Sequence, residues 1–428
     1  MNDSTFPLLR SPEFQELLHE TSRRPLIRRE LADFELPKGA SAEDVWDSLT
    51  AIRRSIAYFS PNVECSVSAA HMNWHTVPAS LQYSLSRLTE LTQRGSELDS
   101  IIEERRSSRF VTQQYIEEIL ANLEYDGFEP DYESIRATLL AERPGKSAPA
   151  KLASNYHAIM QHLDDFADRP FDRSLLEEFY SLLVEGITSE ELVDSASRLV
   201  LPRIDDTATR DFRLETVVAI GNDLMTEPSQ SPIMVSMLIN CKFWRYSLFG
   251  QCNNLVSNIA SRFYLLKKGY PAFRYIPKTK ILDEWKRLGT NMAGAAYTYE
   301  EAHPTEGSDT DWTPYYDTMM KLMLRSVEKA HRTLLELKEA DDSLISAIDG
   351  IDNLNYRQAM LLQQAVLNPG AEFRIATHEK KHGIVYSTAR ADLEQLAERG
   401  FLARMTIDTA NVYKADARLR FLLEQYAR

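Results

Sequence analysis

Glycine, cysteine and long apolar runs are all scarce in this sequence. Only 15 of its 428 residues are glycine, about half the usual ~7%, while Leu, Glu, Arg and Ala are abundant, which predicts a mainly helical chain. No apolar run approaches the roughly 20 residues that cross a bilayer, which excludes a membrane-spanning protein and argues against a membrane partner. The three cysteines, Cys65, Cys241 and Cys252, lack the spacing of a disulfide framework or a zinc site, so we expect reduced, buried thiols.

A secretory signal is also missing, because residues 1–13 have no basic segment followed by an apolar one, and we expect a cytoplasmic protein. A length of 428 residues predicts two to four cooperating units. We divide the chain into a mostly helical region of unassigned role (1–104), a helical core (105–340) and a carboxy-terminal domain (354–428). Residues 341–355 carry Gly and Asp and are expected to form a linker.

Positive charge is scarce in most of the chain. The net charge is −14, but residues 354–428 hold 11 Lys and Arg against 8 Asp and Glu, or +3, which leaves −17 for the preceding residues. An acidic body is a poor non-specific ligand for a phosphate backbone, whereas the carboxy-terminal domain could contact DNA locally.

Apolar residues recur every three or four positions through much of the core, which predicts amphipathic helices. The polar stretch 202–213 interrupts them and is expected to form a short β-hairpin or flap. A helix is expected at 232–246, followed by a break at 247–254 and an apolar helix at 255–268 that ends at Gly269 and Pro271. A long helix is expected at about 314–339.

The carboxy-terminal domain has the element order of a winged helix. Helices are expected at 356–367, 375–382 and 387–398, followed by alternating apolar and polar residues at 401–413 that predict a hairpin. The start of the third helix, where a DNA-reading helix meets the major groove, carries the candidate contact residues Tyr386, Ser387, Thr388 and Arg390. Acidic residues on the same helix oppose tight DNA binding, so docking of a protein, including dimerisation or target capture, is an equal interpretation.

The most informative stretch is FWRYSLFGQCNNLVSNIASRFYLLKKGYP, at 243–271. Gly250 and two asparagines, Asn253 and Asn254, precede an apolar helix, so backbone N–H groups at its amino terminus could bind an anion. The alternative is an ordinary helix cap in which an asparagine side chain satisfies those N–H groups.

This stretch resembles the motif HPFx(D/E)GNGRxxR of the Fic family, whose enzymes transfer AMP from ATP to a protein hydroxyl. The motif falls on Ser247 to Leu255 and on Asn258, and Phe249 and Asn253 match it. Residues 155–158 and 213–221 also resemble the family's NYxxA and FRTxxVxIG stretches, so the resemblance covers about residues 113–428. It implies a helical Fic core with a nucleotide site at Phe249, Gln251, Asn253, Asn254, Asn258 and Arg262.

The departures from the motif oppose catalysis. The family's catalytic histidine is Ser247 here, and a serine hydroxyl does not act as a general base near neutral pH. The acidic Mg²⁺ ligand becomes Gln251, and the two phosphate-binding arginines become Leu255 and Asn258, so binding of ATP with Mg²⁺ is expected to be weakened. Asn254 replaces a glycine, although asparagine tolerates left-handed backbone.

Two further matches concern regulation and rescue. Arg262, one turn beyond Asn258, and Arg245 could reach a phosphate, although a core or surface role is favoured for each. The family's inhibitory helix, (S/T)xxxE(G/N), is matched by NLEYDG, with Asn122, Asp126 and Gly127 at its key positions. No salt bridge to Asn258 can form, so this switch is expected to be disabled.

Histidine pairs offer two metal-site alternatives that we do not favour. HEKKH at 378–382 fits the zinc motif HExxH, but Gly383 ends the helix at once and no clear third ligand follows. His71 and His75 lie four apart beside Trp74, but Pro78 and the absence of nearby carboxylates favour packing.

The sequence therefore predicts a mainly α protein resembling Fic adenylyltransferases with a degenerate motif, most simply a pseudoenzyme that binds partners. The alternatives are an active AMP transferase with a non-standard site and a winged-helix transcriptional regulator. The expected partner is a protein target, with nucleotide, DNA or a second copy of the chain as further candidates, and no metal site is assigned.

Overall fold

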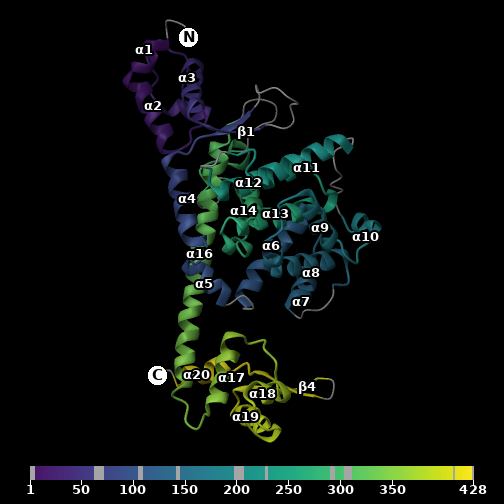
Figure 1. Cartoon of the computed structure of the whole chain (residues 1–428). Helices are drawn as coiled ribbons and strands as arrows, with labels where there is room; N and C mark the ends of the chain where they lie inside the picture. Colours follow the sequence, from purple (N-terminus) through teal and green to yellow (C-terminus); the bar gives the residue numbers. More distant parts are fainter. Residues whose placement is uncertain are drawn as a thin grey trace. The chain divides into compact units, whose positions relative to one another are not determined.

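The computed structural model describes residues 5–61, 72–104, 109–140, 145–196, 207–226, 230–289, 295–302, 311–407 and 410–426 (Figure 1). Its contacts group into two compact units, Met1–Asp99 with Thr112–Lys329, and Ser100–Val111 with Ala330–Arg428. The chain is mainly α-helical, as predicted, and the three-segment division expected from the sequence stays a prediction. Among the described residues, no helix combines the length and apolar character needed to cross a bilayer.

The amino-terminal part of the first unit is a small helical cluster followed by a hairpin. Its helices are α1 (Thr5–Arg10), α2 (Pro12–Arg23), η1 (Arg28–Asp33) and α3 (Ala42–Ser55), which enclose the buried side chains of Phe14, Leu17, Leu26, Leu31, Val45 and Leu49. Strands β1 (Tyr58–Pro61) and β2 (Met72–His75) pair antiparallel, which sets Tyr58 opposite His75. Helices α4 (Ala79–Thr92) and α5 (Glu97–Glu104) follow.

The remaining helices of this unit surround two that are almost wholly buried, α12 (Pro232–Tyr246) and α13 (Asn253–Lys267). Both helices are buried on nearly every side, and Gly269 ends α13 with a φ of 88°. The surrounding elements are α6 (Arg109–Tyr125), α7 (Tyr132–Leu140), α8 (Ala148–Gln161), η2 (Leu163–Phe166), α9 (Arg173–Leu183), α10 (Ser189–Asp194), α11 (Thr207–Gly221), η3 (Gly250–Cys252), η4 (Pro271–Arg274), α14 (Thr279–Leu288) and α15 (Tyr299–Ala302).

Two expectations about chain breaks were wrong. The hairpin expected at 202–213 is replaced in its described part by helix α11, which begins at Thr207, while residues 202–206 lie outside the described residues. The linker expected at 341–355 is helical for half its length, because α16 runs from Thr313 to Ile348. Leu344, Ala347 and Ile348 are buried at helical spacing, and their burial outweighs the turn-forming composition.

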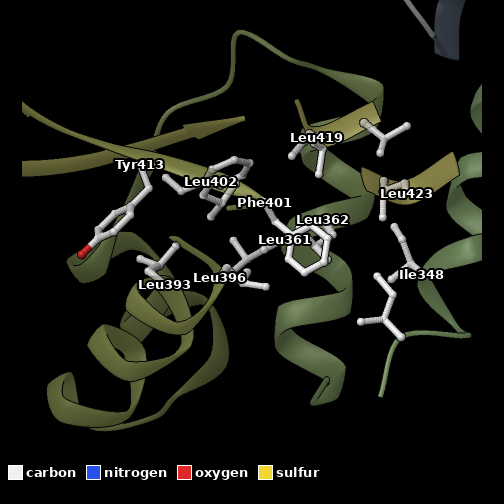
Figure 2. Packing of buried hydrophobic residues seen from close by; sticks show 14 of the residues in the cluster. Ile348, Leu361, Leu362, Leu393, Leu396, Phe401, Leu402, Tyr413, Leu419 and Leu423 are labelled. Atoms are coloured by element: carbon white, nitrogen blue, oxygen red, sulfur yellow. The ribbon is translucent and has the colours of Figure 1, made fainter. Parts of the chain in front are cut away.

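The carboxy-terminal elements belong to the second unit and follow the expected order of three helices and a hairpin. They are α17 (Tyr356–Leu367), β3 (Phe373–Arg374), α18 (Ile375–His382), α19 (Tyr386–Glu398), β4 (Leu402–Ile407), β5 (Ala410–Ala415) and α20 (Leu419–Glu424). The sheet order is β3-β5-β4, with Phe373 paired to Tyr413 and Leu402 to Ala415. Figure 2 shows the core, in which Leu361 and Leu362 of α17, Leu393 and Leu396 of α19, and Phe401 point toward one another.

Candidate functional site

The turn between α12 and α13 is built on two residues with left-handed backbone. Ser247 has a φ of 47° and ends α12 by donating its N–H to the carbonyl of Phe243, 2.9 Å away. Gly250 has a φ of 57° and starts the short η3 helix. The helix after the turn begins at Asn253, so Asn254 is helical. Although Asn254 replaces a glycine of the motif, it does not adopt the left-handed backbone conformation.

Asn253 and Phe249, the two residues that match the family motif, hold this turn together. The Asn253 side-chain oxygen accepts the Phe249 N–H at 3.3 Å, and its amide donates to the Phe243 carbonyl at 2.8 Å. The Phe249 ring stacks on Phe243, with ring centroids 6.0 Å apart. These contacts are internal to the turn, so both residues position the start of α13.

The amino terminus of α13 is occupied by a carboxylate of the protein itself. The two oxygens of Asp126 accept the N–H groups of Asn254 and Leu255, at 2.7 and 3.0 Å. The Asp126 side chain is buried, and an anion at this position is favoured by the unpaired N–H groups and the dipole of the helix. The Asp126 carboxylate, rather than an asparagine side chain, therefore caps the start of α13.

Asn122, one turn before Asp126, extends the same contact. Its side-chain oxygen accepts hydrogen bonds from the amides of Asn254 and Asn258, at 2.6 and 2.5 Å, and from the Thr279 hydroxyl at 3.0 Å. Asn122 and Asp126 thus pair with α13 through hydrogen bonds, where the family pattern would use a salt bridge.

Gln251 and Gly127 lie at the same junction. The Gln251 amide donates to the Asp126 carbonyl at 3.0 Å, so the residue at the metal-ligand position contacts α6. Gly127 has a φ of 88°, and its N–H bonds to the Glu124 carbonyl, which ends α6 directly after Asp126. The end of α6 is thereby fixed against the start of α13.

A second helix amino terminus is filled by Glu118, which the sequence analysis missed. Its carboxylate accepts the N–H groups of Lys278, Thr279 and Lys280, at 3.0, 2.9 and 3.1 Å, at the start of α14. The same carboxylate accepts from Arg262 at 2.8 Å, and both side chains are 2% exposed. The spacing of Glu118, Asn122 and Asp126 at i, i+4 and i+8 places them on one face of α6, which was the available sequence signal.

Arg262 uses all its donors inside the protein. A guanidinium has five N–H groups, and five hydrogen bonds at 2.6 to 3.4 Å connect it to acceptors in Glu118, Tyr156, Asn258, Phe273 and Ile276. Burial alone would lower the pKa of Arg262, but Tyr156 and Glu118 raise it overall, so the group stays charged. Arg262 therefore has no free N–H to offer a phosphate in this arrangement.

A buried lysine lies behind this pair. The Lys278 ammonium nitrogen contacts the Ser261 hydroxyl at 2.7 Å and the side-chain oxygen of Asn240. Burial lowers the pKa of Lys278 well below its usual value, and the charge of Arg262 lowers it further. Burial also raises the pKa of the neighbouring Cys241 thiol to about 11. The raised pKa keeps the Cys241 thiol protonated, and the buried Lys278 nitrogen is already bonded to Ser261 and Asn240, so both side chains are part of the core.

The position of the family's general base carries little chemistry here. Ser247 is half-buried, and within the described part of the chain its hydroxyl has no hydrogen-bond partner. A nearby group that could accept its proton would have to be a base within hydrogen-bond reach. The two carboxylates of α6 do not qualify, because helix N–H groups hold both.

The predicted carboxy-terminal contact residues lie together in the first turn of α19. Three of them are exposed, Tyr386, Ser387 and Arg390, and Thr388 is half-buried. The exposed residue Val385 directly precedes the helix. Arg390 donates to Glu394 at 2.9 Å. The four residues lie at the start of one helix, as the sequence predicts.

The HEKKH motif has a structural role in its first histidine. His378 is buried, and its Nε2 lies 3.0 Å from the carboxylate of Asp392, which also binds Arg357 at 2.7 Å. His378 thereby ties α18 to α19 and α17. In the described ranges, no group of three or more His, Cys, Asp or Glu side chains could hold a metal ion.

Comparisons with known proteins show a likeness to solved structures. No family model matches the sequence, and no curated protein matches it. The structure is similar to the crystal structure of a Fic family protein from Desulfovibrio desulfuricans G20, with 14% identity and a TM-score of 0.44 over 80% of this chain and 97% of that one.

Proposed function

We propose that this chain is a degenerate protein of the Fic family that acts by binding a protein partner and does not transfer AMP. The order and spacing of the sequence motifs support the family, since the NYHA stretch, the α12 entry helix and the degenerate motif follow one another through α8, α12 and α13. The exchange of the catalytic histidine for Ser247 supports the loss of transfer.

The observation that carries the proposal is the Asp126 carboxylate at the start of α13. A nucleotide phosphate bound there would have to displace a buried anion that makes two charge-assisted hydrogen bonds. Neither motif arginine is present to offset the free-energy cost of displacing Asp126, and the N–H groups of Arg262 already bond within the protein. The free energy therefore favours the nucleotide-free arrangement, in which Asp126 stays bonded to the start of α13.

Calorimetric titration of ATP, with and without Mg²⁺, tests this proposal together with transfer of labelled AMP to lysate proteins. We expect neither binding nor transfer by the unaltered chain. Mg²⁺-dependent ATP binding with label transfer would refute the proposal and favour an active transferase.

A substitution separates the role of Asp126 from general instability. Asp126→Ala should expose the N–H groups of Asn254 and Leu255 and lower the free energy of unfolding by about 1–2 kcal/mol, as loss of a helix cap does. Glu124→Gln, an exposed change two residues away, is the matched control. Transfer activity gained by Asp126→Ala would show that α6 restrains a competent site, against the proposal.

For the carboxy-terminal domain, the exposed apolar residues at the start of α19 favour protein docking over DNA reading. Val385 is 65% exposed and Tyr386 is 53% exposed, while Arg390 and Arg404 both lie near the carboxylate of Glu394, at 2.9 and 3.8 Å. This pairing weakens the positive field that DNA binding needs. Interpreted as a winged helix, the domain would bind a protein, including a second copy of the chain.

Light scattering and a salt series of DNA-binding assays distinguish these partners. We expect Tyr386→Ser to reduce self-association or target capture, with no salt-dependent DNA binding by either form. DNA affinity that falls steeply with salt would instead favour the regulator.

A further inference from the structure

A cavity of about 440 Å³ lies in the first unit, formed by elements that the motif analysis does not use. Its walls come from the β1–β2 hairpin, α4, the start of α12 and the segment after α13; Figure 1 labels β1, α4, α12 and α13. The lining residues are Tyr58, His75, Val77, Gln82, Leu85, Ser86, Thr89, Gln230, Ser231, Pro232, Met234 and Tyr270. Its volume lies in the range of small-molecule sites, about 300–1,000 Å³.

The lining residues that the structure describes include no side chain that is charged at neutral pH. Tyr58, His75 and Tyr270 supply rings, and the other residues are apolar or carry hydroxyl and amide groups. A phosphate or carboxylate would lose its hydration here without gaining a cationic partner, which is unfavourable. The cavity therefore suits an uncharged molecule.

His75 is a buried polar residue of the lining that lacks a hydrogen-bond partner at one ring nitrogen among the described residues. Its side chain is 2% exposed, and its Nε2 makes no hydrogen bond to any residue within the described ranges. The ring is held on two sides, stacked on Tyr58 at 5.4 Å between centroids and meeting Tyr316 edge-on at 5.0 Å. Burial lowers the pKa of His75 to about 4, so the imidazole is neutral at pH 7 and can donate or accept one hydrogen bond at Nε2.

Gln230 and Ser231, directly before α12, contribute further polar side chains to the cavity. Ser231 stands at the cap position of α12, yet its side chain makes no capping hydrogen bond, and Pro232 follows at the first helical position. The Gln230 amide nitrogen is buried and likewise lacks a partner among the described residues. Buried polar groups are normally paired, so the two unpaired nitrogens in this lining, of His75 and Gln230, point to a missing ligand.

We infer that this cavity is a binding site for a small, uncharged, ring-bearing molecule that carries a carbonyl or hydroxyl group. The ring would lie among Tyr58, His75 and Tyr270, and the polar group would bond to His75 Nε2 and to the unpaired amide nitrogen of Gln230. The inference does not depend on the proposed function, because none of these residues belongs to the α13 turn or its contacts with α6.

Three isosteric probes that differ in charge test the inference on the full chain. Benzamide is neutral, benzoate is an anion and benzamidinium is a cation, and saturation-transfer NMR measures the binding of each at about millimolar concentration. We expect benzamide to bind at least tenfold more tightly than either ion. Equal binding of all three probes, or no binding by any, would overturn the inference.

Two substitutions locate the binding. His75→Phe keeps the ring contacts with Tyr58 and Tyr316 and removes Nε2, and it should weaken benzamide binding at least tenfold. Thr89→Phe should block binding by filling the cavity from α4, whereas Tyr83→Phe is the control, since Tyr83 lies on the same helix but is 62% exposed and outside the lining.

Circular dichroism and thermal unfolding establish that each variant is folded. If His75→Phe does not fold, Thr89→Phe still decides the question, because it leaves the hairpin untouched. Unchanged benzamide affinity in a folded Thr89→Phe variant would place the probe elsewhere and refute the assignment.

Discussion

Replacing Glu118 by glutamine perturbs one carboxylate that four donors share. One oxygen accepts from Thr279 N–H and Arg262, and the other accepts from the N–H groups of Lys278 and Lys280. A glutamine oxygen can keep one of these pairs, but its amide nitrogen then faces two donors. Glu118→Gln also leaves the Arg262 charge buried without its counter-ion.

The expected loss follows from what remains unpaired. Removing one partner of a buried ion pair costs about 3–5 kcal/mol, and the Glu118 and Arg262 side chains are each 2% exposed. We therefore expect Glu118→Gln to lower the free energy of unfolding of the first unit by about 3–5 kcal/mol. The three hydrogen bonds to α14 are part of this loss and are not added to it, because such contributions are not additive.

Tryptophan fluorescence during urea unfolding measures this loss selectively. All five tryptophans lie between residues 46 and 312, inside the first unit. Glu117→Gln is the matched control, since Glu117 is the preceding residue, is 34% exposed and pairs with Lys280 at the surface. A surface pair contributes about 0–1 kcal/mol, so the control should be nearly neutral.

A double-mutant cycle tests the reasoning further. If the cost comes from an orphaned charge, Glu118→Met combined with Arg262→Met should lose less stability than the two single changes together, by at least about 1 kcal/mol. Equal destabilisation by Glu118→Gln and Glu117→Gln, or strict additivity in the cycle, would refute the central role given to this pair.

Three further outcomes are expected. Gly221→Ala should cost about 1–3 kcal/mol, measured by urea unfolding, because the new Cβ would lie 2.3 Å from the buried Phe171 ring. Acidification from pH 6.5 toward 4 should destabilise the first unit. The burial-lowered pKa of His75, about 4, lets the unfolded chain bind a proton that the folded chain does not, and His75→Phe should remove this share, at most about 3 kcal/mol. Asp392→Asn should weaken the buried contact with His378 and lower the free energy of unfolding of the second unit by about 3 kcal/mol. The change should affect unfolding followed by circular dichroism more than unfolding followed by tryptophan fluorescence, because the tryptophans lie in the first unit.

The local pattern of the sequence predicts the helices around the site well. The expected helices at 232–246 and 255–268 appear as α12 and α13, because apolar periodicity and the Gly269 stop act over a few residues. The expected linker failed for the opposite reason, since burial of Leu344 and Ile348 is a tertiary effect that composition does not reveal.

The contacts of the site were harder to foresee. In the family pattern Asp126 would pair with residue 258, which is an uncharged asparagine here, so the sequence predicts a disabled switch. In the structure Asp126 binds backbone N–H groups, which every residue except proline carries, so the identity of Asn254 or Leu255 held no signal. The sequence favours a packing role for His75 over metal binding, and its side chain is buried. No sequence pattern could show that its Nε2 lacks a hydrogen-bond partner among the described residues.

The position of α6 in the chain bears on how the protein is made. Asp126 is separated from Asn254 by 128 residues, and Glu118 from Lys280 by 162, so α6 leaves the ribosome long before the helices that it caps exist. During that interval its contact face exposes carboxylates and an amide, which water solvates well, in place of apolar side chains that would promote association. The face that locks the finished core is thus made early and used late, because its closure must await synthesis of residue 280.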